Sequence, residues 1–437
     1  MIGIFALVLL GLNSLIAQSD STFTLYGQVL DSLSGQAIPY SNVYVKNTLK
    51  GTLTNEHGHF YLKMTQGDKK DTLQFSLMGF EPLEIPLTAS TPQPLMVYLT
   101  PSPVQLKEAI VLPLEPEDYV KKAIIKMAEN FPDTAYNSTL YYREILKENE
   151  HYNQYTEALL DVYNLPYSGT PSDTTQIRIK AGKEYDDLSE IEFMQGFAEK
   201  QKKKYYKKQK KKGNEVVKSD VKGFTPEFIN PYWILDSNLV RKRQMFLDTN
   251  DFKLYDYKFS HISKLDDKRV MCIEFDQKDK VRDPLFAGTI YLEEESLAIV
   301  ALEFHLSEKG KKYLIPGYAK PVMWAMRLKV SPPLFGAFIR NREINGKWYL
   351  EYIKFTMDAE LTKKYYFDDD HHSRFTGEQI LVVVDRDLGG AETFPAEEIA
   401  LKTKPIRKQL KKDSAQVNWT EYSRIQPPKN LEEGQKQ

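Results

Sequence analysis

The sequence predicts a mainly β protein, with an N-terminal seven-stranded β-sandwich, a short helical segment and then a larger antiparallel β-sheet domain. Two observations lead to this prediction. From Leu25 to Leu99, short apolar-alternating runs are separated at regular intervals by Gly, Pro, Asn and Ser, as in small β-sandwiches. After Asn137 apolar residues alternate again, in patterns that suit an antiparallel sheet. The 437 residues, 41% of them hydrophobic, suffice for two or three domains with filled cores.

An apolar run opens the chain, from Ile2 to Ile16, and ends at Ala17 before polar sequence. This pattern is typical of a secretory signal peptide, so we expect residues 1–17 to be cleaved and the protein to be exported. An uncleaved anchor is the alternative, but the run is shorter than the about 20 residues that cross a bilayer core. Because Cys272 is the only cysteine, no intramolecular disulfide can form, and its apolar neighbours predict a core position.

The sandwich segment, residues 25–99, carries turn chemistry from Asn55 to Gly58, between two expected strands. Phe60 and Leu62 should return to the buried face, while His59 and Tyr61 point away. The segment's recurring residues are Gly27-Gln28-Val29, Asp31, Gly35, Ile38-Pro39, Val43-Tyr44-Val45, Gly51-Thr52, Thr54, Gly58, Phe60, and Leu77-Met78-Gly79-Phe80. In this order they resemble the carboxypeptidase-regulatory-like domain, a transthyretin-type sandwich found in Gram-negative envelope proteins. In carboxypeptidases this module is accessory to a separate zinc-containing catalytic domain, so the resemblance implies no catalytic role.

A connector and a helix follow the sandwich. Residues 100–116 contain four prolines, which forbid a helix and favour an extended connector. Residues 117–403 form the second predicted domain, and its first element is a helix with acidic Glu117 and Asp118 at its start and Pro132 at its end. One face of this helix should dock on the rest of the domain, since apolar residues recur there at helical spacing. They are Val120, Ala123, Ile124, Met127, Ala128 and Phe131.

Alternation predicts individual strands of the larger sheet from Tyr255 to Ser260, from Val300 to Leu306 and from Trp324 to Val330. Asn345-Gly346 predicts a tight hairpin between a strand through Phe338 and one from Trp348 to Met357. A second turn is expected from Glu293 to Ser296. Residues 404–437 are expected to be a polar C-terminal tail.

Two phrases of the second domain, Tyr141-Tyr142-Arg143-Glu144 and Gly288 to Leu292 with Leu297-Ala298-Ile299, resemble the middle region of long envelope proteins of unknown function. The second phrase more weakly resembles the curved sheet of lipoprotein-sorting carriers. These resemblances imply a β-rich envelope protein, and we expect no transmembrane segment after signal cleavage.

The charges of the whole chain nearly cancel, with 59 basic and 60 acidic residues, so no overall field recruits nucleic acid. The strongest local feature is the basic run from Lys202 to Lys212, which encloses Tyr205 and Tyr206. Such a run could bind the phosphates of lipid or polysaccharide. A solvated loop or helix end is the favoured interpretation, and we expect no nucleic-acid partner.

Candidate chemistry is sparse. His305-Leu306-Ser307-Glu308 matches the His-x-x-Glu of zinc carboxypeptidases in letters, with His371 or His372 as a conceivable third ligand. In a strand, however, residues three apart point to opposite faces, which argues against a shared metal. His57 and His59 fall at an expected turn, and the run from Asp368 to His372 is explained by a solvated loop. We therefore predict no catalytic, cofactor-binding or metal site.

Function is expected from location and architecture. The leading hypothesis is an exported, non-catalytic cell-envelope protein, periplasmic or associated with the outer membrane. It is expected to act as an adaptor or binding module for an envelope protein or surface polymer, with the β-sandwich as its docking domain and the larger β region as its main platform. One alternative is a carrier of a lipid-like ligand on a curved antiparallel sheet, which needs an apolar cavity on the order of several hundred Å³. The other alternative is a zinc carboxypeptidase.

Overall fold

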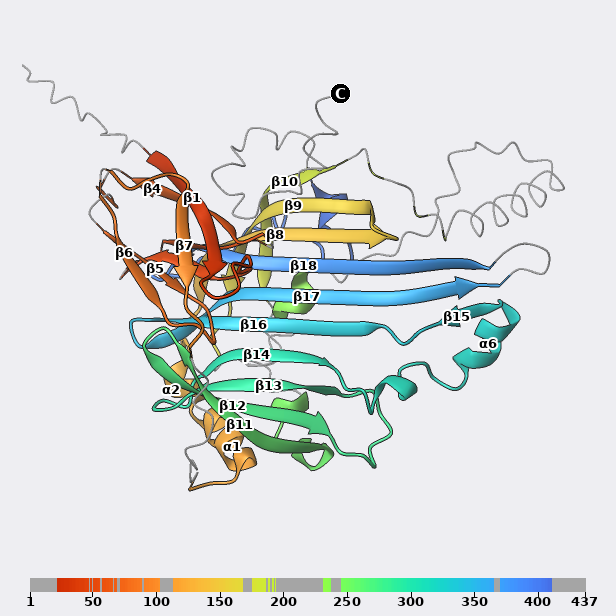
Figure 1. Ribbon diagram of the computed structural model, residues 1–437. Coiled ribbons are helices and arrows are strands. Elements are labelled where there is room, and N and C mark those ends of the chain that lie inside the picture. The colour runs from red at the N-terminus through yellow and green to blue at the C-terminus, as the bar shows by residue number, and fades with distance from the viewer. Residues whose placement is uncertain are drawn as a thin grey trace, which may run out of the picture.

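The computed structural model describes residues 22–410, except for residues 47, 49, 56, 66, 69–70, 89, 103–112, 168–174, 186–187, 189–190, 192, 194–230, 237–244 and 365–369. The fold is mainly β, as the sequence predicts. A small β-sandwich lies at one end of a long, 11-stranded antiparallel sheet (Figure 1). None of the helices among the described residues has the length and hydrophobicity to cross a membrane.

The sandwich contains the seven predicted strands in two sheets. One sheet has the order β4-β1-β7, in which β1 and β7 run parallel, and the other has the order β3-β2-β5-β6. Side chains of both sheets fill the core between them, and Val29, Phe60, Phe75 and Leu99 are fully buried there. The strands are β1 (Thr22–Asp31), β2 (Asn42–Val45), β3 (Gly51–Leu53), β4 (His59–Thr65), β5 (Thr72–Ser76), β6 (Leu83–Pro86) and β7 (Leu95–Leu99).

The turn before β4 forms as the sequence predicts. The Asn55 side chain accepts hydrogen bonds from the backbone N–H groups of His57 and His59, each at 2.9 Å. Gly58 has a φ of +73°, and a Cβ there would lie 2.5 Å from the carbonyl oxygen of Val29. Only glycine therefore fits this position without a shift of the backbone.

The long sheet has the order β10-β9-β8-β18-β17-β16-β14-β13-β12-β11, and a short strand, β15, pairs with the end of β17. The β16–β17 hairpin turns at Asn345 and Gly346, both with positive φ, as predicted. The strands are β8 (Tyr136–Glu148), β9 (His151–Asn164), β10 (Gln176–Glu184), β11 (Tyr255–Leu265), β12 (Lys268–Gln277), β13 (Phe286–Glu293), β14 (Ile299–Leu306), β15 (Leu328–Val330), β16 (Leu334–Ile344), β17 (Lys347–Lys363) and β18 (His371–Asp387).

Helices cover one face of the long sheet, which we call the helix face. The predicted first helix is present as α1 (Pro116–Ile125) and α2 (Met127–Asn130), which are separated at Lys126. Val120, Ala123 and Met127 are buried against the sheet, whereas Ala128 is exposed. The other helical elements are α4 (Pro231–Asp236), η3 (Met245–Leu247), η4 (Phe252–Leu254), η5 (Lys311–Tyr313), α6 (Ala319–Ala325) and η6 (Ile406–Gln409).

One predicted strand is wrong. Residues 319–325 form the helix α6, and only Leu328–Val330 at the end of the predicted segment is a strand. Arg327 has a φ of +55° and ends the helix, because a left-handed residue directs the chain out of a helix. The alternating Trp324, Met326 and Leu328 therefore do not share the face of one strand.

The C-terminal part of the described chain packs against the edge of the sheet. The Ala400 N–H donates to the carbonyl of Ile177 in β10 at 2.8 Å, and Ile406 of η6 is buried in the core of the helix face. The first part of the predicted polar tail, residues 404–410, therefore packs on the rest of the protein through Ile406.

Candidate binding surfaces

The sandwich packs on the face of the long sheet opposite α1, which we call the sandwich face. Tyr40, before β2, stacks on Tyr352 of β17 with ring centroids 5.8 Å apart. Leu53 of β3 joins the apolar cluster of this face. Arg342 of β16 lies over the ring of Tyr44 at 4.3 Å and donates to the carbonyl of Thr48 at 2.9 Å. These contacts fix the sandwich on the sheet of its own chain.

A buried charge network lies beside this contact. Glu378 of β18 accepts a hydrogen bond from Arg143 of β8 at 2.7 Å and pairs with Lys354 of β17 at 2.9 Å. The hydroxyl of Tyr40 accepts a hydrogen bond from Lys354 at 2.8 Å and donates to Glu378 at 3.3 Å. Burial opposes ionisation of Glu378, but the Arg143 and Lys354 charges outweigh it and hold the pKa of this carboxyl below its usual value. The sandwich thereby shares in a network that the sheet provides.

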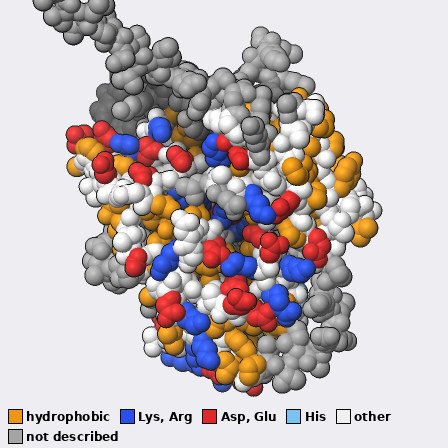
Figure 2. Space-filling view, turned by 90° about the vertical axis from the view of Figure 1, so that its left-hand side faces the viewer, with side chains coloured by type: hydrophobic (Ala, Val, Ile, Leu, Met, Phe, Trp, Pro, Cys, Tyr) orange, Lys and Arg blue, Asp and Glu red, His pale blue; other side chains and the backbone are white. Residues whose placement is uncertain are grey.

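A cavity of about 550 Å³ opens where the sandwich meets the β11–β12 and β16–β17 turns, and we call it the junction cavity. Charged side chains of both signs line it and pair with one another, as Lys268 does with Glu343 at 2.7 Å. Asp266 accepts a hydrogen bond from Tyr44 at 2.9 Å. Figure 2 looks at this end of the molecule and shows acidic and basic side chains intermixed over the described surface. Most of the residues that line the cavity are charged or polar, whereas a lipid tail favours a predominantly apolar lining.

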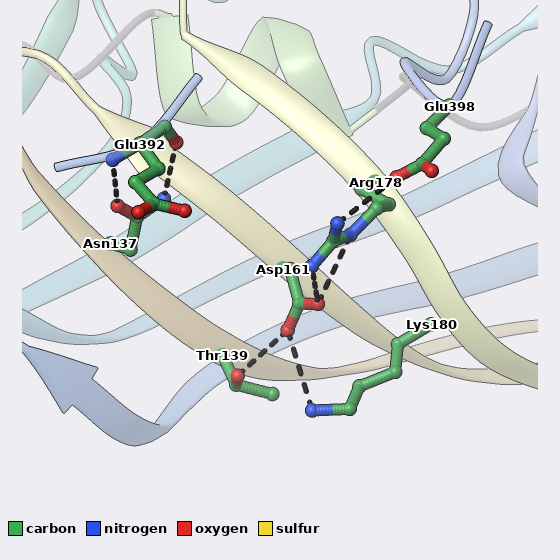
Figure 3. Close-up of polar contacts among 7 residues, drawn as sticks. All are labelled: Asn137, Thr139, Asp161, Arg178, Lys180, Glu392 and Glu398. Carbon is green, nitrogen blue, oxygen red and sulfur yellow. Dashed lines mark hydrogen bonds and ion pairs between the residues drawn. The ribbon is translucent and has the colours of Figure 1, made fainter. Parts of the chain in front are cut away.

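A second cavity, of about 530 Å³, lies at the β10 edge of the sheet, and we call it the edge cavity (Figure 3). Asp161 of β9 occupies its centre and accepts hydrogen bonds from Thr139 at 2.8 Å and Arg178 at 2.9 Å. Arg178 also bonds Glu398 at 3.0 Å. The Asn137 amide donates to the backbone carbonyl of Glu392 at 3.0 Å. The polar groups of this cavity therefore fasten the segment after β18 to β8, β9 and β10.

Two buried carboxyls lie on opposite faces of β8 and β9. Glu144 points to the helix face, where it accepts hydrogen bonds from Tyr142, Gln154 and Gln379. Glu157 points to the sandwich face and accepts from Tyr141 and Tyr185. Burial raises the pKa of both carboxyls, against the lowering effect of these donors. The phrase Tyr141-Tyr142-Arg143-Glu144 thus supplies one tyrosine to each buried glutamate, a pairing that sequence reasoning missed because both strands are buried on both faces.

The helix face is not uniformly covered. Near α1 its residues are fully buried, but a row of phenylalanines on β13, β14, β16 and β17 is only half-buried. Phe335 stacks on Phe355 with centroids 6.2 Å apart, and Phe286 packs edge-on against Phe304 at 5.4 Å. Neither the junction cavity nor the edge cavity is lined by this row.

The end of the long sheet opposite the sandwich carries α6 and β15, and we call the segment 311–334 the free end (Figure 1). The side chains of Tyr318 and Trp324 are each 83% exposed there. Met326 and Leu334 are also exposed. Apolar side chains are thus concentrated here that the described part of the chain leaves exposed.

The residues of the conceivable zinc site do not come together. His305 lies on β14 with its Nδ1 3.0 Å from the carbonyl oxygen of Ala287, and Glu308 lies beyond the strand and pairs with Lys311. In the register of the sheet, His305 lies opposite Gly336 of β16, which lies opposite Thr356 of β17. His372 of β18 lies opposite Thr362 of β17. Thr356 and Thr362 are six residues apart on β17, so the two histidines are separated by about 20 Å along the strand direction. In the described part of the chain no three His, Cys, Asp or Glu side chains gather in a way that could hold a metal ion.

The other residues singled out from the sequence have ordinary places or lie outside the described residues. Cys272 is fully buried in β12, and this burial raises the pKa of its thiol to about 12. His371 and His372 bond to Ser373 and Thr362 on their own hairpin. The predicted signal peptide, the basic run from Lys202 to Lys212, and Asp368 and Asp369 lie outside the described residues.

Comparison with known families identifies the N-terminal part of the chain. Residues 25–111 match the CarboxypepD_reg-like domain, so the predicted carboxypeptidase-regulatory-like domain is confirmed. No curated protein matches the chain.

Solved structures give distant likenesses. A LolA superfamily protein from Nitrosomonas europaea aligns over 64% of this chain and 97% of its own, at 10% identity and a TM-score of 0.24. A DUF1329 family protein from Desulfovibrio piger aligns over 64% of this chain and 96% of its own, at 10% identity and a TM-score of 0.22. Lipovitellin aligns over 63% of this chain and 28% of its own, at 10% identity and a TM-score of 0.24.

Proposed function

We propose that this chain is an exported, non-catalytic binding protein of the bacterial cell envelope, in which the sandwich holds the long sheet and the sheet presents its free end to a partner. The CarboxypepD_reg-like domain and the apolar run before Ala17 support the location. One observation carries the binding role. The sandwich is engaged on its own sheet through Tyr40, while at the opposite end Tyr318 and Trp324 are 83% exposed.

A non-catalytic role is supported by where the candidate groups lie. The two buried glutamates are enclosed by their own hydrogen-bond donors, and charged groups of both cavities, such as Arg178 and Lys268, pair with other segments of the chain. A catalytic group must reach a substrate and be poised by its neighbours, and these groups face other parts of the fold.

Export is tested by producing the full chain with its own first residues in a Gram-negative host. We expect mass spectrometry of the purified protein to show loss of residues 1–17, and fractionation to place the protein outside the cytoplasm. A full-length cytoplasmic product would contradict the location. Zinc analysis tests the absence of a peptidase site, since stoichiometric metal whose chelation unfolds the protein would contradict a non-catalytic role.

A second candidate function, carriage of a lipid-like ligand, is favoured by the half-buried phenylalanine row on β13, β14, β16 and β17. Partly exposed aromatic rings in a row can cover an acyl chain. Native mass spectrometry of the purified protein tests this candidate. We expect a carrier to lose its bound lipid in Phe335→Ser and to keep it in Leu33→Ser, which changes an exposed residue of the sandwich. That result would favour lipid carriage over partner binding.

A further inference from the structure

The free end concentrates exposed apolar side chains. Ten large hydrophobic residues are exposed among the described residues, and four of them lie between residues 318 and 334. They are Tyr318 and Trp324, each 83% exposed, Leu334 at 47% and Met326 at 39%. A cluster of this kind on an otherwise well-packed molecule marks an interaction surface.

The charged residues of the free end are all basic. Residues 311–334 contain five Lys and Arg residues and no Asp or Glu, although acidic residues number 60 in the 437 of the chain. One of the five, Lys311, is paired with Glu308. Lys312, Lys320 and Lys329 are exposed. On the adjoining ends of β17 and β18, Asp358 is paired with Arg374 at 2.6 Å, and the exposed Glu360 and Asp370 are accompanied by Lys363 and Lys364. The free end therefore combines aromatic rings with a local excess of positive charge.

The fold holds this surface in place. Strand β15 pairs with the end of β17, beyond the part of β17 that pairs with β16. Leu328 lies opposite Lys363, and Val330 lies opposite Leu361. The Lys364 N–H donates to the carbonyl of Arg327 at 3.0 Å. Helix α6 is thus tied to the sheet immediately after it ends, and the aromatic side chains extend from a fixed support.

We propose that the free end docks on the headgroup layer of an anionic lipid bilayer, with Trp324 and Tyr318 entering the interface and the surrounding lysines meeting lipid phosphates. Trp and Tyr favour this layer because their rings are amphipathic, and Lys and Arg are attracted to anionic lipids. A second copy of the chain is a poor occupant, since it would bring the same positive charge to the contact. This inference rests on the proposed function for its cellular setting, because it names the partner of the exported scaffold.

Vesicle binding by the purified protein tests the proposal. Vesicles of phosphatidylcholine alone are compared with vesicles that also contain phosphatidylglycerol, by co-sedimentation. We expect binding to the anionic vesicles to be stronger by about tenfold or more, and to fall as salt is raised. The double variant Lys320→Glu, Lys329→Glu should lose this preference. The matched variant Lys122→Glu, Lys253→Glu changes the net charge equally at exposed positions on α1 and η4, and should keep it.

The aromatic contribution is tested separately. The double variant Tyr318→Ala, Trp324→Ala should bind anionic vesicles roughly tenfold less, whereas Leu33→Ala with Ile125→Ala, which removes two equally exposed side chains elsewhere, should bind as the parent does. Tryptophan quenching by brominated lipid should disappear in Trp324→Phe.

Three results would overturn the inference. The first is equal binding to both kinds of vesicle, and the second is binding that neither free-end double variant weakens. The third is a concentration-dependent dimer that the free-end double variants abolish. The last result would assign the surface to self-association. Because vesicle binding is measured on purified protein, its failure is distinct from a failure of export.

Discussion

The ammonium group of Lys354, in the long sheet, lies 4.1 Å from the centre of the Tyr40 ring in the sandwich and 2.8 Å from its hydroxyl. The two residues are 314 positions apart in the sequence. Their contact joins the sandwich to the buried Glu378 network, so the sheet supplies both the surface and the charge that hold the sandwich. The sandwich and the long sheet are therefore held together at one end of the sheet, and the free end lies at the other.

Removal of Glu378 should destabilise the protein strongly. Glu378→Ala deletes the carboxylate that faces Arg143 and Lys354, and the loss of one partner from a buried ion pair costs about 3 kcal/mol in the free energy of unfolding. Asp358→Ala is the matched control, since it removes a carboxylate on the same face whose arginine partner, Arg374, is exposed. Urea unfolding should show a much smaller change in Asp358→Ala. Equal changes would contradict the importance assigned to the buried network.

The sandwich should separate from the sheet when Tyr40 is replaced. Tyr40 has a φ of +58°, so Tyr40→Asn removes the ring and keeps a residue that tolerates this backbone. The lost stacking on Tyr352 and the lost contact with Lys354 should together weaken the interface by about 2 kcal/mol. Calorimetry should then resolve two unfolding transitions. The control Tyr26→Asn removes a sandwich tyrosine stacked on Tyr61 and should show the same unfolding transitions as the parent protein. If Tyr40→Asn also unfolds as the parent does, the Tyr40 ring does not hold the sandwich on the sheet.

Two glycines of the sandwich should respond differently to alanine. Gly35 and Gly58 have similar positive φ values, +69° and +73°, so the backbone strain is shared. Nothing lies within 4 Å of a Cβ at Gly35, whereas a Cβ at Gly58 would lie 2.5 Å from the carbonyl oxygen of Val29. We expect Gly35→Ala to cost about 1 kcal/mol and Gly58→Ala about 3 kcal/mol in thermal or urea unfolding. A reversed order would mean that the sandwich accommodates the added methyl group at Gly58.

Much of the fold follows from local sequence. The sandwich turn at Asn55 to Gly58 and the hairpin at Asn345-Gly346 were predictable because each needs special backbone angles that few residues adopt. The segment from Trp324 to Val330 misled, because its alternation of apolar residues is compatible with a strand, whereas only Leu328–Val330 pairs with β17 and the residues before Arg327 form α6.

The candidate surfaces were less accessible from the sequence. Tyr40 and Lys354, or Arg178 and Glu398, meet only because the chain returns after more than 200 residues, and no local sequence pattern predicts such pairs. The free end did carry a signal in the chain itself, namely the absence of acidic residues from 311 to 334. That signal concerns the composition of a window, which motif reading does not detect.

Glu144 and Glu378 should give the stability of the protein opposite dependences on pH. Burial raises the pKa of Glu144, so in the window above its usual value of 4.5 the folded protein holds a proton that the unfolded chain has released, and stability falls as pH rises through that window. The pKa of Glu378 is lowered, because the Arg143 and Lys354 charges outweigh the cost of its burial. Its contribution is present above the usual value of 4.5 and is lost as pH falls through the lowered value.

Neutral amides isolate the two effects. At neutral pH, Glu144→Gln should be more stable than the parent protein and Glu378→Gln less stable. Burial outweighs the attraction of Arg407 and the hydrogen-bond donors at Glu144, whereas the second variant removes the partner of two cations. At acidic pH, where the parent carboxyls are protonated, both differences should shrink toward zero. Urea unfolding across this pH range measures both stability differences. In Glu144→Gln, part of the fall in stability with rising pH should remain, because burial also raises the pKa of Glu157. If both variants shift stability in the same direction at neutral pH, the ionisation states assigned to the two carboxyls are wrong.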